Sequence, residues 1–554
     1  MYSRFKSMLE KRAKTLNEMF DFKKAGKKLS AVLDGIKSLP SKLSETQIAE
    51  EYDFEEEPIA IFRGVEGYKE VERYWVVEPY AFITILFNEE KHEYLYNVVE
   101  PALTPFEREL LEELHERLQD VLILEDIGET TDREEVLTEN AKTILRDYVK
   151  EIDPRSFAKI LYFLKRNYIR FGRIDPLMND PFIEDISCNG PNAPVFLYHK
   201  NYESIATNIV FEEEELNSFV IRLAQRCGKH ISIANPLIDA TMADGSRIQI
   251  SLGREITTKG STFTIRKFKE IPITPVDLIN WNTFSSECMA YLWLCSENNK
   301  SIIFAGGTAS GKTSSMNAVC LFIPPKSKIV TIEDTRELKL PHPNWIAEVT
   351  RESFAGEERG EVGMYELLRA ALRQRPEYLL VGEVRGSEAI VLFQAMSTGH
   401  TTYSTMHADS VPSVVHRLES EPINVPRTML QALDIVCVQI QTYIGDRRVR
   451  RVDRIAELTE IDPDTKKLKT VDIFVWNPMT DGFDKVGESL ALEEIKRRRG
   501  WTQKELKKEL ENRQTILEYM VENKIKDFKK ITDIIQAYYI DPERVMEMIE
   551  SKTF

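Results

Sequence analysis

A glycine-rich loop between an apolar run and a helical pattern is the feature that most constrains this chain. Residues 301–305 (Ser-Ile-Ile-Phe-Ala) lead into Gly306-Gly-Thr-Ala-Ser-Gly-Lys-Thr313, which fits the pattern G-x-x-x-x-G-K-[ST] in full. Glycines let the backbone wrap closely around phosphate groups, and the N–H groups at the start of a helix form a nest for anions. The pattern therefore predicts a nucleoside triphosphate site at a strand-to-helix turn.

The residues of this loop have distinct predicted roles. Lys312 is expected to reach the β- and γ-phosphates, and the Thr313 hydroxyl to ligate Mg²⁺. A chance match in a glycine-rich loop is the alternative, but the strand pattern before the loop and the helical pattern of residues 315–322 after it argue against chance. The predicted nucleotide-binding residues are Gly306, Gly307, Thr308, Ala309, Ser310, Gly311, Lys312, Thr313 and Ser314.

Length and charge limit the classes of function. The 554 residues predict several domains, and the net charge of −16 argues against a nucleic-acid partner, because such binding depends on neutralising phosphates. The apolar runs are far shorter than the roughly 20 residues that span a bilayer, and no signal-peptide pattern follows Met1, so we expect a cytoplasmic protein. The six cysteines form no C-x-x-C pair, so neither a disulfide nor a structural zinc is predicted.

Composition and turn signals divide the chain into five predicted parts. The first carries 11 Lys and Arg against 4 Asp and Glu, with apolar residues at roughly helical spacing. It is interpreted either as a docking segment for a membrane surface or a partner, or as a solvated, partly disordered tail. The parts are a basic tail at 1–42, a small module with strands and a helix at 43–132, an α/β domain at 133–267, a proline-containing hinge linker at 268–281, and an ATPase domain with a C-terminal helical tail at 282–554.

Three further strand patterns end in residues that suit phosphate chemistry. Residues 328–334 end in the two acids Glu333 and Asp334, residues 378–383 end in Glu383, and residues 401–407 end in His407. Parallel strands present the residues at their carboxyl ends along one edge of a sheet, so these side chains are predicted to meet the phosphate loop.

The predicted catalytic residues are Lys312, Glu333, Glu383 and His407. Glu333 is expected to position or deprotonate the attacking water, Glu383 to hold Mg²⁺, and His407 to sense the γ-phosphate. The roles of the two glutamates are interchangeable at this point. For each acid a solvated or capping carboxylate is the alternative, and for the histidine a structural role.

These motifs resemble the secretion ATPase superfamily, which drives type IV pili, type II and type IV secretion and the archaellum. The resemblance is carried by the loop, by Thr-Ile-Glu-Asp-Thr-Arg at 331–336, by the segment 372–386 with its Gly-Glu pair, and by the His-containing segment 398–409. Shorter matches lie at 171–177, 244–247 and 263–268. The segments 422–426 and 432–436 look closest to the archaeal branch and to the archaellum motor ATPase, although archaeal pilus-assembly ATPases share much of this sequence.

The resemblance implies an α/β fold, with a RecA-like P-loop NTPase domain on a mostly parallel sheet preceded by a smaller α/β N-terminal domain. It implies ATP and Mg²⁺ as cofactors and a homohexameric ring, peripheral at the inner face of the cell membrane. The implied partners are a polytopic membrane platform protein, which mediates membrane association, and other cytoplasmic motor components. Arginines implied to stabilise phosphates or to sense the ring interface, with surface ion pairs as the alternative, are Arg247, Arg266, Arg336, Arg369 and Arg373.

Two other function classes and one further motif stay open. A nucleic-acid translocase would share the phosphate loop, and so would a scaffold that binds nucleotide without hydrolysing it. The segment Arg447-Arg-Val-Arg-Arg451 lies between strand patterns and is interpreted either as a solvated hairpin or as a surface that docks onto a membrane platform. The amphipathic helices predicted after Thr502 are expected to serve packing.

Overall fold

The computed structural model describes residues 59–124, 133–148, 152–268, 272–351, 362–445, 447–461 and 468–551. The predicted basic tail at 1–42 lies outside these residues. The chain divides into two compact units, one comprising 1–183 with 192–211 and the other comprising 184–191 with 212–554. Among the described residues, no helix is both long enough and apolar enough to cross a membrane.

The first unit packs helices against a mainly antiparallel sheet. Its strands run in the order β1-β2-β3-β6-β5, and only the β3–β6 pair is parallel. Apolar side chains from the helices form one core, which includes Leu114, Leu145 and Leu164. The elements are β1 (Lys69–Val77), β2 (Ala81–Asn88), β3 (Glu93–Val99), α3 (Pro105–Leu124), α4 (Arg133–Tyr148), α5 (Pro154–Tyr168), η1 (Gly172–Ile174), α6 (Asp175–Asn179), β5 (Pro194–His199) and β6 (Glu203–Val210).

The second unit begins with a small antiparallel group of strands. In this group β4 pairs with β9, β9 with β8, and β8 with β7. Alternate residues of β8 and β9 are buried, and Phe263 packs against Phe219 of α7. The elements are β4 (Ile183–Cys188), α7 (Glu213–Arg226), β7 (Leu237–Thr241), β8 (Arg247–Ser251) and β9 (Thr262–Arg266).

A nine-stranded sheet organises the rest of the second unit. Its order is β12-β11-β13-β14-β10-β15-β16-β17-β18, parallel from β12 to β15 and antiparallel from there on, so the predicted mostly parallel sheet is confirmed. The strands are β10 (Ile302–Gly306), β11 (Ile329–Glu333), β12 (Trp345–Val349), β13 (Tyr378–Val381), β14 (Thr401–Met406), β15 (Ile435–Ile444), β16 (Arg447–Ile461), β17 (Leu468–Asn477) and β18 (Gly482–Lys485).

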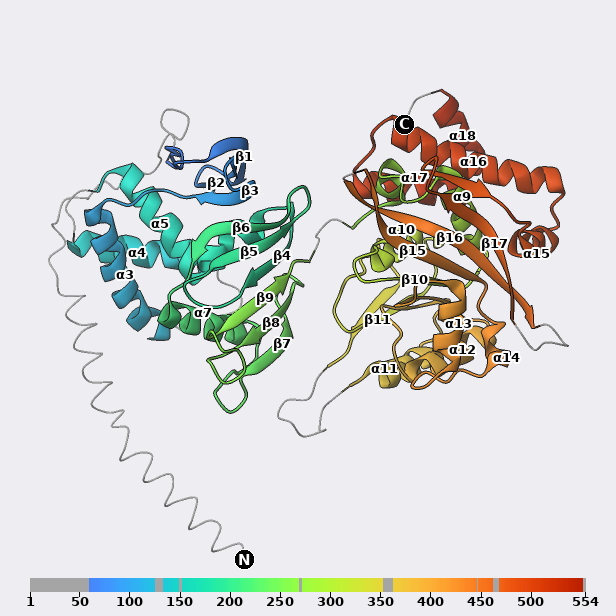
Figure 1. Cartoon of the computed structure of the whole chain (residues 1–554), viewed down its shortest axis with the longest axis horizontal. Helices are drawn as coiled ribbons and strands as arrows, with labels where there is room; N and C mark the ends of the chain where they lie inside the picture. Colours follow the sequence, from blue (N-terminus) through green and yellow to red (C-terminus); the bar gives the residue numbers. More distant parts are fainter. Residues whose placement is uncertain are drawn as a thin grey trace, which may run out of the picture. The chain divides into compact units, whose positions relative to one another are not determined.

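Alternate side chains of these strands pack into two separate cores. Along β10, Ile302 and Phe304 enter one core, whereas Ile303 and Ala305 enter the other. Helices therefore cover both faces of the sheet, as Figure 1 shows. One face carries α8 (Pro275–Asn280), α9 (Ser286–Glu297), α10 (Lys312–Cys320), α15 (Leu490–Arg499), α16 (Gln503–Glu522), α17 (Phe528–Ile540) and α18 (Pro542–Glu550), and the other carries α11 (Met364–Arg373), α12 (Glu388–Ser397), α13 (Val411–Glu419) and α14 (Arg427–Leu430).

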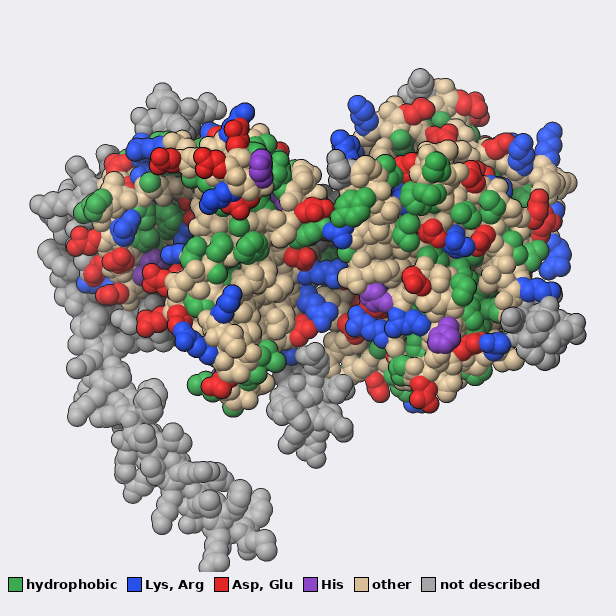
Figure 2. Space-filling view, viewed as in Figure 1, with side chains coloured by type: hydrophobic (Ala, Val, Ile, Leu, Met, Phe, Trp, Pro, Cys, Tyr) green, Lys and Arg blue, Asp and Glu red, His purple; other side chains and the backbone are tan. Residues whose placement is uncertain are grey.

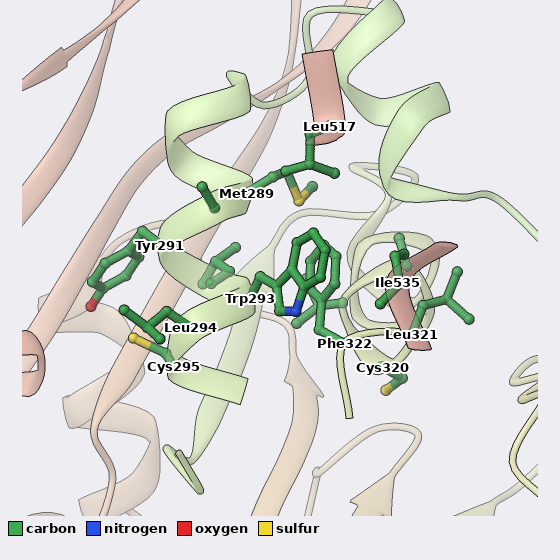
Figure 3. Close-up of a cluster of buried hydrophobic side chains, with 14 of the residues drawn as sticks. Met289, Tyr291, Trp293, Leu294, Cys295, Cys320, Leu321, Phe322, Leu517 and Ile535 are labelled. Atoms are coloured by element: carbon green, nitrogen blue, oxygen red, sulfur yellow. The ribbon is translucent and has the colours of Figure 1, made fainter. Parts of the chain in front are cut away.

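The core on the first of these faces is built around α9. The Trp293 indole stacks on the Phe322 ring with centroids 5.0 Å apart, and side chains of the C-terminal helices close over the pair (Figure 3). Cys288 and Cys295, seven residues apart on α9, are both buried here as free thiols. The two thiols lie in one core.

Part of the predicted linker is helical. Residues 269–271 lie outside the described part of the chain, but α8 begins at Pro275. Thr274 and Asp277 form a reciprocal capping box, and a proline at the first helical position starts a helix because its missing N–H has no partner there in any case. Pro275, interpreted as part of a hinge linker, thus lies at the start of a short helix. The five-part division of the chain stays a prediction.

A buried ion pair attaches the C-terminal helices to α9. Arg513 of α16 pairs with Glu297, and both side chains are almost fully buried. Glu297 also accepts a hydrogen bond from Trp293 Nε1 at 2.7 Å, and the Arg513 guanidinium lies 5.7 Å from the Trp293 ring centroid and 5.0 Å from that of Tyr538. The Glu297 carboxylate thus has its counter-charge only while the two helices stay together, whereas Arg513 also pairs with Glu509 of its own helix at 2.7 Å.

We expect Arg513→Met to lower the free energy of unfolding of the second unit by about 3–5 kcal/mol, because it leaves the Glu297 carboxylate buried without its counter-charge. Urea denaturation measures this loss. The matched control is Lys507→Met on the same helix, whose pair with Glu511 is exposed and is expected to contribute less than about 1 kcal/mol. Equal losses in the two variants would contradict the structural role of the buried pair.

Candidate nucleotide-binding site

The glycine-rich loop leaves β10 in a conformation that requires glycine. Gly306 has φ +157°, and a Cβ there would lie 2.5 Å from Ser310 Oγ and still closer to the carbonyl oxygen of Gln439 on β15. Gly311, with φ +93°, forms the N-cap of α10. The loop therefore passes tightly against β15 and turns directly into a helix whose first N–H groups are available to an anion.

Lys312 lies at the centre of the site. Its side chain is largely buried, and Nζ donates a hydrogen bond to the Gly307 carbonyl at 2.8 Å. Nζ is also 3.5 Å from Nδ1 of His407, which follows β14. Burial lowers the pKa of Lys312, and burial together with the nearby Lys312 charge lowers the pKa of His407. The imidazole is thus biased toward its neutral form beside the lysine.

Glu383 extends this cluster from the end of β13. One carboxylate oxygen, Oε1, lies 3.2 Å from His407 Nε2, and the other accepts a hydrogen bond from Arg385 at 2.5 Å. Burial acts to raise the pKa of Glu383, but the Arg385 hydrogen bond and charge outweigh it, so the pKa is lowered. Glu383 is therefore an anion at neutral pH, which is the state that a metal ligand requires.

Glu333 is in the opposite electrostatic state. It is 2% exposed at the end of β11, and its Oε1 accepts hydrogen bonds from the backbone N–H groups of Glu337 and Leu338, each at 3.0 Å. Its Oε2 is buried and has no hydrogen-bond partner among the described residues. Burial raises the pKa of Glu333 to about 7. A carboxyl with this pKa can exchange a proton near neutral pH.

The predicted arginines do not form one group. Arg247 and Arg266 face each other across β8 and β9, and Arg247 forms a bidentate pair with Asp239. Arg336 is exposed in the loop after β11, and its charge lowers the Glu333 pKa in part. Arg369 and Arg373 lie on the exposed side of α11, with Arg369 over the Tyr365 ring.

Sequence reasoning missed three side chains at this site. Arg385 pairs with Glu383, Gln439 Nε2 donates to Ser315 Oγ of α10 at 2.6 Å, and Arg450 Nε donates to the Ala309 carbonyl at 2.9 Å. Arg385 stands only two residues after Glu383. This short spacing in the sequence could have identified it as a partner of Glu383. Gln439 and Arg450 come from distant strands, and only the sheet order brings them here.

The residues present fit a nucleotide and its metal. The loop approaches β15 so closely that a Cβ at Gly306 is excluded, a lysine and an arginine lie at the loop, and Glu333 keeps an unpartnered buried oxygen. Thr313 and Ser314 occupy the first turn of α10, beside the N–H groups that face the loop. In Figure 2, Lys and Arg side chains gather on the visible face near the place of β11 in Figure 1. This surface suits a polyanion.

Sequence comparisons relate the chain to known proteins. The family model described as type II/IV secretion system protein matches residues 174–478, and two models described as PilB3-like, N-terminal and C-terminal, match residues 34–102 and 479–553. An uncharacterized protein of Methanocaldococcus jannaschii is 41% identical over 471 residues, which cover 80% of this chain and 85% of the relative. The type IV secretion system protein PtlH of Bordetella pertussis is 30% identical over 273 residues, 43% of this chain and 80% of PtlH.

Among solved structures, the VirB11 ATPase of the Brucella suis type IV secretion system is 26% identical, with a TM-score of 0.27. The match covers 52% of this chain and 93% of that one. The predicted fold class, a P-loop NTPase domain on a mostly parallel sheet with a smaller α/β region before it, is confirmed. The model match spans more than half of the residues, so the chain belongs to the type II/IV secretion system protein family of secretion and pilus ATPases.

Proposed function

We propose that this chain is a Mg²⁺-dependent ATPase. The observation that supports the proposal best is the cluster of Lys312, Glu383 and His407, which brings together the ends of β10, β13 and β14 at one edge of the sheet. A cation for the phosphates, an anion for a metal and a neutral imidazole are thereby within reach of one transferring phosphoryl group. A scaffold that only holds a nucleotide does not need all three.

Different residues of the site are assigned to the phosphates and to the metal. Lys312 and the N–H groups from Gly307 to Thr313 hold the β- and γ-phosphates in place. Thr313 and Glu383 would hold Mg²⁺, which supplies charge neutralisation at the phosphate oxygens when bound. His407 donates or accepts a hydrogen bond at the γ-phosphate side, where it lies between Lys312 and Glu383.

The two glutamates are assigned to different roles. Glu383 is anionic because Arg385 stabilises its charge, which suits a metal ligand. Glu333 has a pKa near 7 and a free buried oxygen, which suits a group that orients the attacking water and takes its proton. We therefore assign the proton transfer to Glu333 at Oε2.

The mechanical role is proposed from the family. Hydrolysis is coupled to movement in a homohexameric ring, which pushes on a polytopic membrane platform protein together with other cytoplasmic motor components. Arg247, Arg266, Arg336, Arg369 and Arg373 are candidates for phosphate stabilisation or for the ring interface. The ring works at the inner face of the cell membrane, held there by the platform protein, and it needs no nucleic acid.

The machine proposed is one that assembles a type IV pilus-like filament. The archaellum is the first candidate, on the segments 422–426 and 432–436. A pilus is the second, because PilB3-like models match both ends of the chain.

The proposed activity is tested by Lys312→Ala. We expect kcat/KM for Mg-ATP to fall at least about 100-fold, or about 2.7 kcal/mol, because the loop loses its cation at the transferring phosphate. Steady-state phosphate release at several protein concentrations, with mass measured in parallel, gives the turnover and its dependence on assembly. The matched control is Lys326→Ala, an exposed lysine after α10, which is expected to keep wild-type turnover.

The same assay separates the other classes of function. Added DNA or RNA is expected to leave turnover unchanged, whereas stimulation of a monomer would identify a translocase. A wild-type protein that binds ATP without releasing phosphate would be a scaffold. Turnover in Lys312→Ala equal to that of Lys326→Ala would refute the assignment of the loop.

Glu333→Gln tests the proton-transfer role through pH. The wild-type kcat is expected to rise as pH increases through about 7, since Glu333 must lose its proton to act as a base, and the variant is expected to lose most of its turnover at every pH. The Lys312 site is unchanged in this variant, so ATP binding is expected to persist.

Glu333→Gln is also expected to change how the free energy of unfolding depends on pH. Between the ordinary pKa of 4.5 and the raised value of about 7, the folded protein keeps a proton that the unfolded chain releases. The wild-type free energy of unfolding therefore falls as pH rises through this window, by up to about 3 kcal/mol. The glutamine variant is expected to lack this decline, whereas Glu337→Gln, an exposed neighbour, is expected to keep it. Parallel pH profiles for wild type and Glu333→Gln would show that Glu333 does not titrate there.

Deletion of the gene in its native host distinguishes the two candidate machines. Loss of swimming and of the archaellum with retention of adhesive pili supports the first, and the reverse pattern supports the second. Electron microscopy of the cell surface and a motility assay measure the two outcomes, with the Lys312→Ala gene as the control for a protein that is present but inactive. Normal filaments of both kinds would exclude filament assembly.

A further inference from the structure

A β-hairpin extends beyond the phosphate loop at the nucleotide edge of the sheet. Strand β10 ends at Gly306, which pairs with Gln439 of β15, but β15 continues to Ile444 before β16 returns alongside it. Gln441 of β15 lies opposite Arg450 of β16 in this extension. The hairpin thus places a basic strand next to the loop.

Arg450 contacts the middle of the loop. Its Nε donates a hydrogen bond to the Ala309 carbonyl at 2.9 Å, and its Cδ would be 3.4 Å from a Cβ at Gly311. Ala309 itself has φ +59°, a conformation that an alanine adopts only where its surroundings hold it. The arginine side chain therefore both covers the loop and fixes one of its strained residues.

Three other arginines of β16 are engaged elsewhere. Arg448 donates to Gln441, Arg451 forms a bidentate pair with Asp481, and Arg454 pairs with Asp453 and Asp472. Within the described ranges, Arg450 has no carboxylate partner, and only its Nε is hydrogen-bonded to the protein. Its two terminal nitrogens remain available at a loop whose N–H groups already suit phosphate.

We propose that Arg450 is a phosphate-binding and loop-positioning residue, with Nε holding the Ala309 carbonyl while the terminal nitrogens bind the polyphosphate chain of the nucleotide. This inference rests on the proposed function for the identity of the ligand. A guanidinium can make both contacts at once because its donors form a rigid planar fork, whereas an ammonium group has one nitrogen for both. The basic hairpin, expected to be either solvated or a docking surface, is assigned here to the nucleotide.

Equilibrium binding of a fluorescent ATP analogue to the full chain tests the proposal without requiring turnover. R450A is expected to raise the Kd about tenfold, equivalent to about 1.4 kcal/mol, and R450K to give an intermediate Kd because it keeps the charge but not the fork. The matched control is R448A on the same hairpin, with a Kd within about twofold of wild type. Melting temperatures of all variants are measured alongside to check folding.

Displacement of the analogue by inorganic pyrophosphate separates phosphate contact from loop positioning alone. The proposal expects pyrophosphate affinity to fall in R450A as ATP affinity does, and the salt dependence of binding to become shallower. A Kd in R450A equal to that in R448A would overturn the inference, and so would unchanged pyrophosphate affinity. A wild-type chain that binds the analogue but never hydrolyses ATP would refute the proposed ATPase activity. The Kd values of R450A and R448A would still test the role of Arg450 in binding.

Discussion

Burial of β10 on both of its faces is the constraint on which the second unit depends. All five residues of the strand are buried between two parallel neighbours, β14 and β15, so helices must cover the sheet on both sides. Alternate side chains then feed two separate cores. The same short strand ends at Gly306, so the tight loop begins where β14 also ends and where His407 emerges. Packing and the position of the site are therefore set by one element.

Two carboxylates at the ends of the neighbouring strands β11 and β13 show how the surroundings determine chemistry. Glu383 has Arg385 beside it and a lowered pKa, whereas Glu333 is enclosed with only backbone N–H donors and has a pKa of about 7. Hydrogen bonds from neutral groups do not offset the loss of solvation of Glu333. The residue type is the same in both positions, so the difference in role arises from Arg385, two residues after Glu383, and from the burial of Glu333.

Much of this unit could be predicted from sequence, because its signals are local. The apolar runs that became β10, β11, β13 and β14, and the loop after β10, lie within short windows, and parallel pairing then predicts that their ends meet. The rest depends on contacts between distant residues. Arg450 reaches Ala309 across 141 positions of sequence, and Glu333 is capped by a loop whose path no periodicity reveals. Pro275 shows a local ambiguity, since proline both ends and begins helices.

The ion pair between Arg513 and Glu297 bears on how modular this protein is. Sequence models divide the chain at residues 478 and 479, as if the C-terminal part were an independent attachment. The structure places that part inside the same core, where Arg513 compensates a glutamate of α9 and the carboxylate of Glu457 on β16 accepts hydrogen bonds from the first N–H groups around α15. The boundary between the two models thus does not coincide with a boundary between hydrophobic cores. A fragment cut there would keep Glu297 and Glu457 with only part of their hydrogen-bond donors, so this segment and the surface that it covers depend on each other.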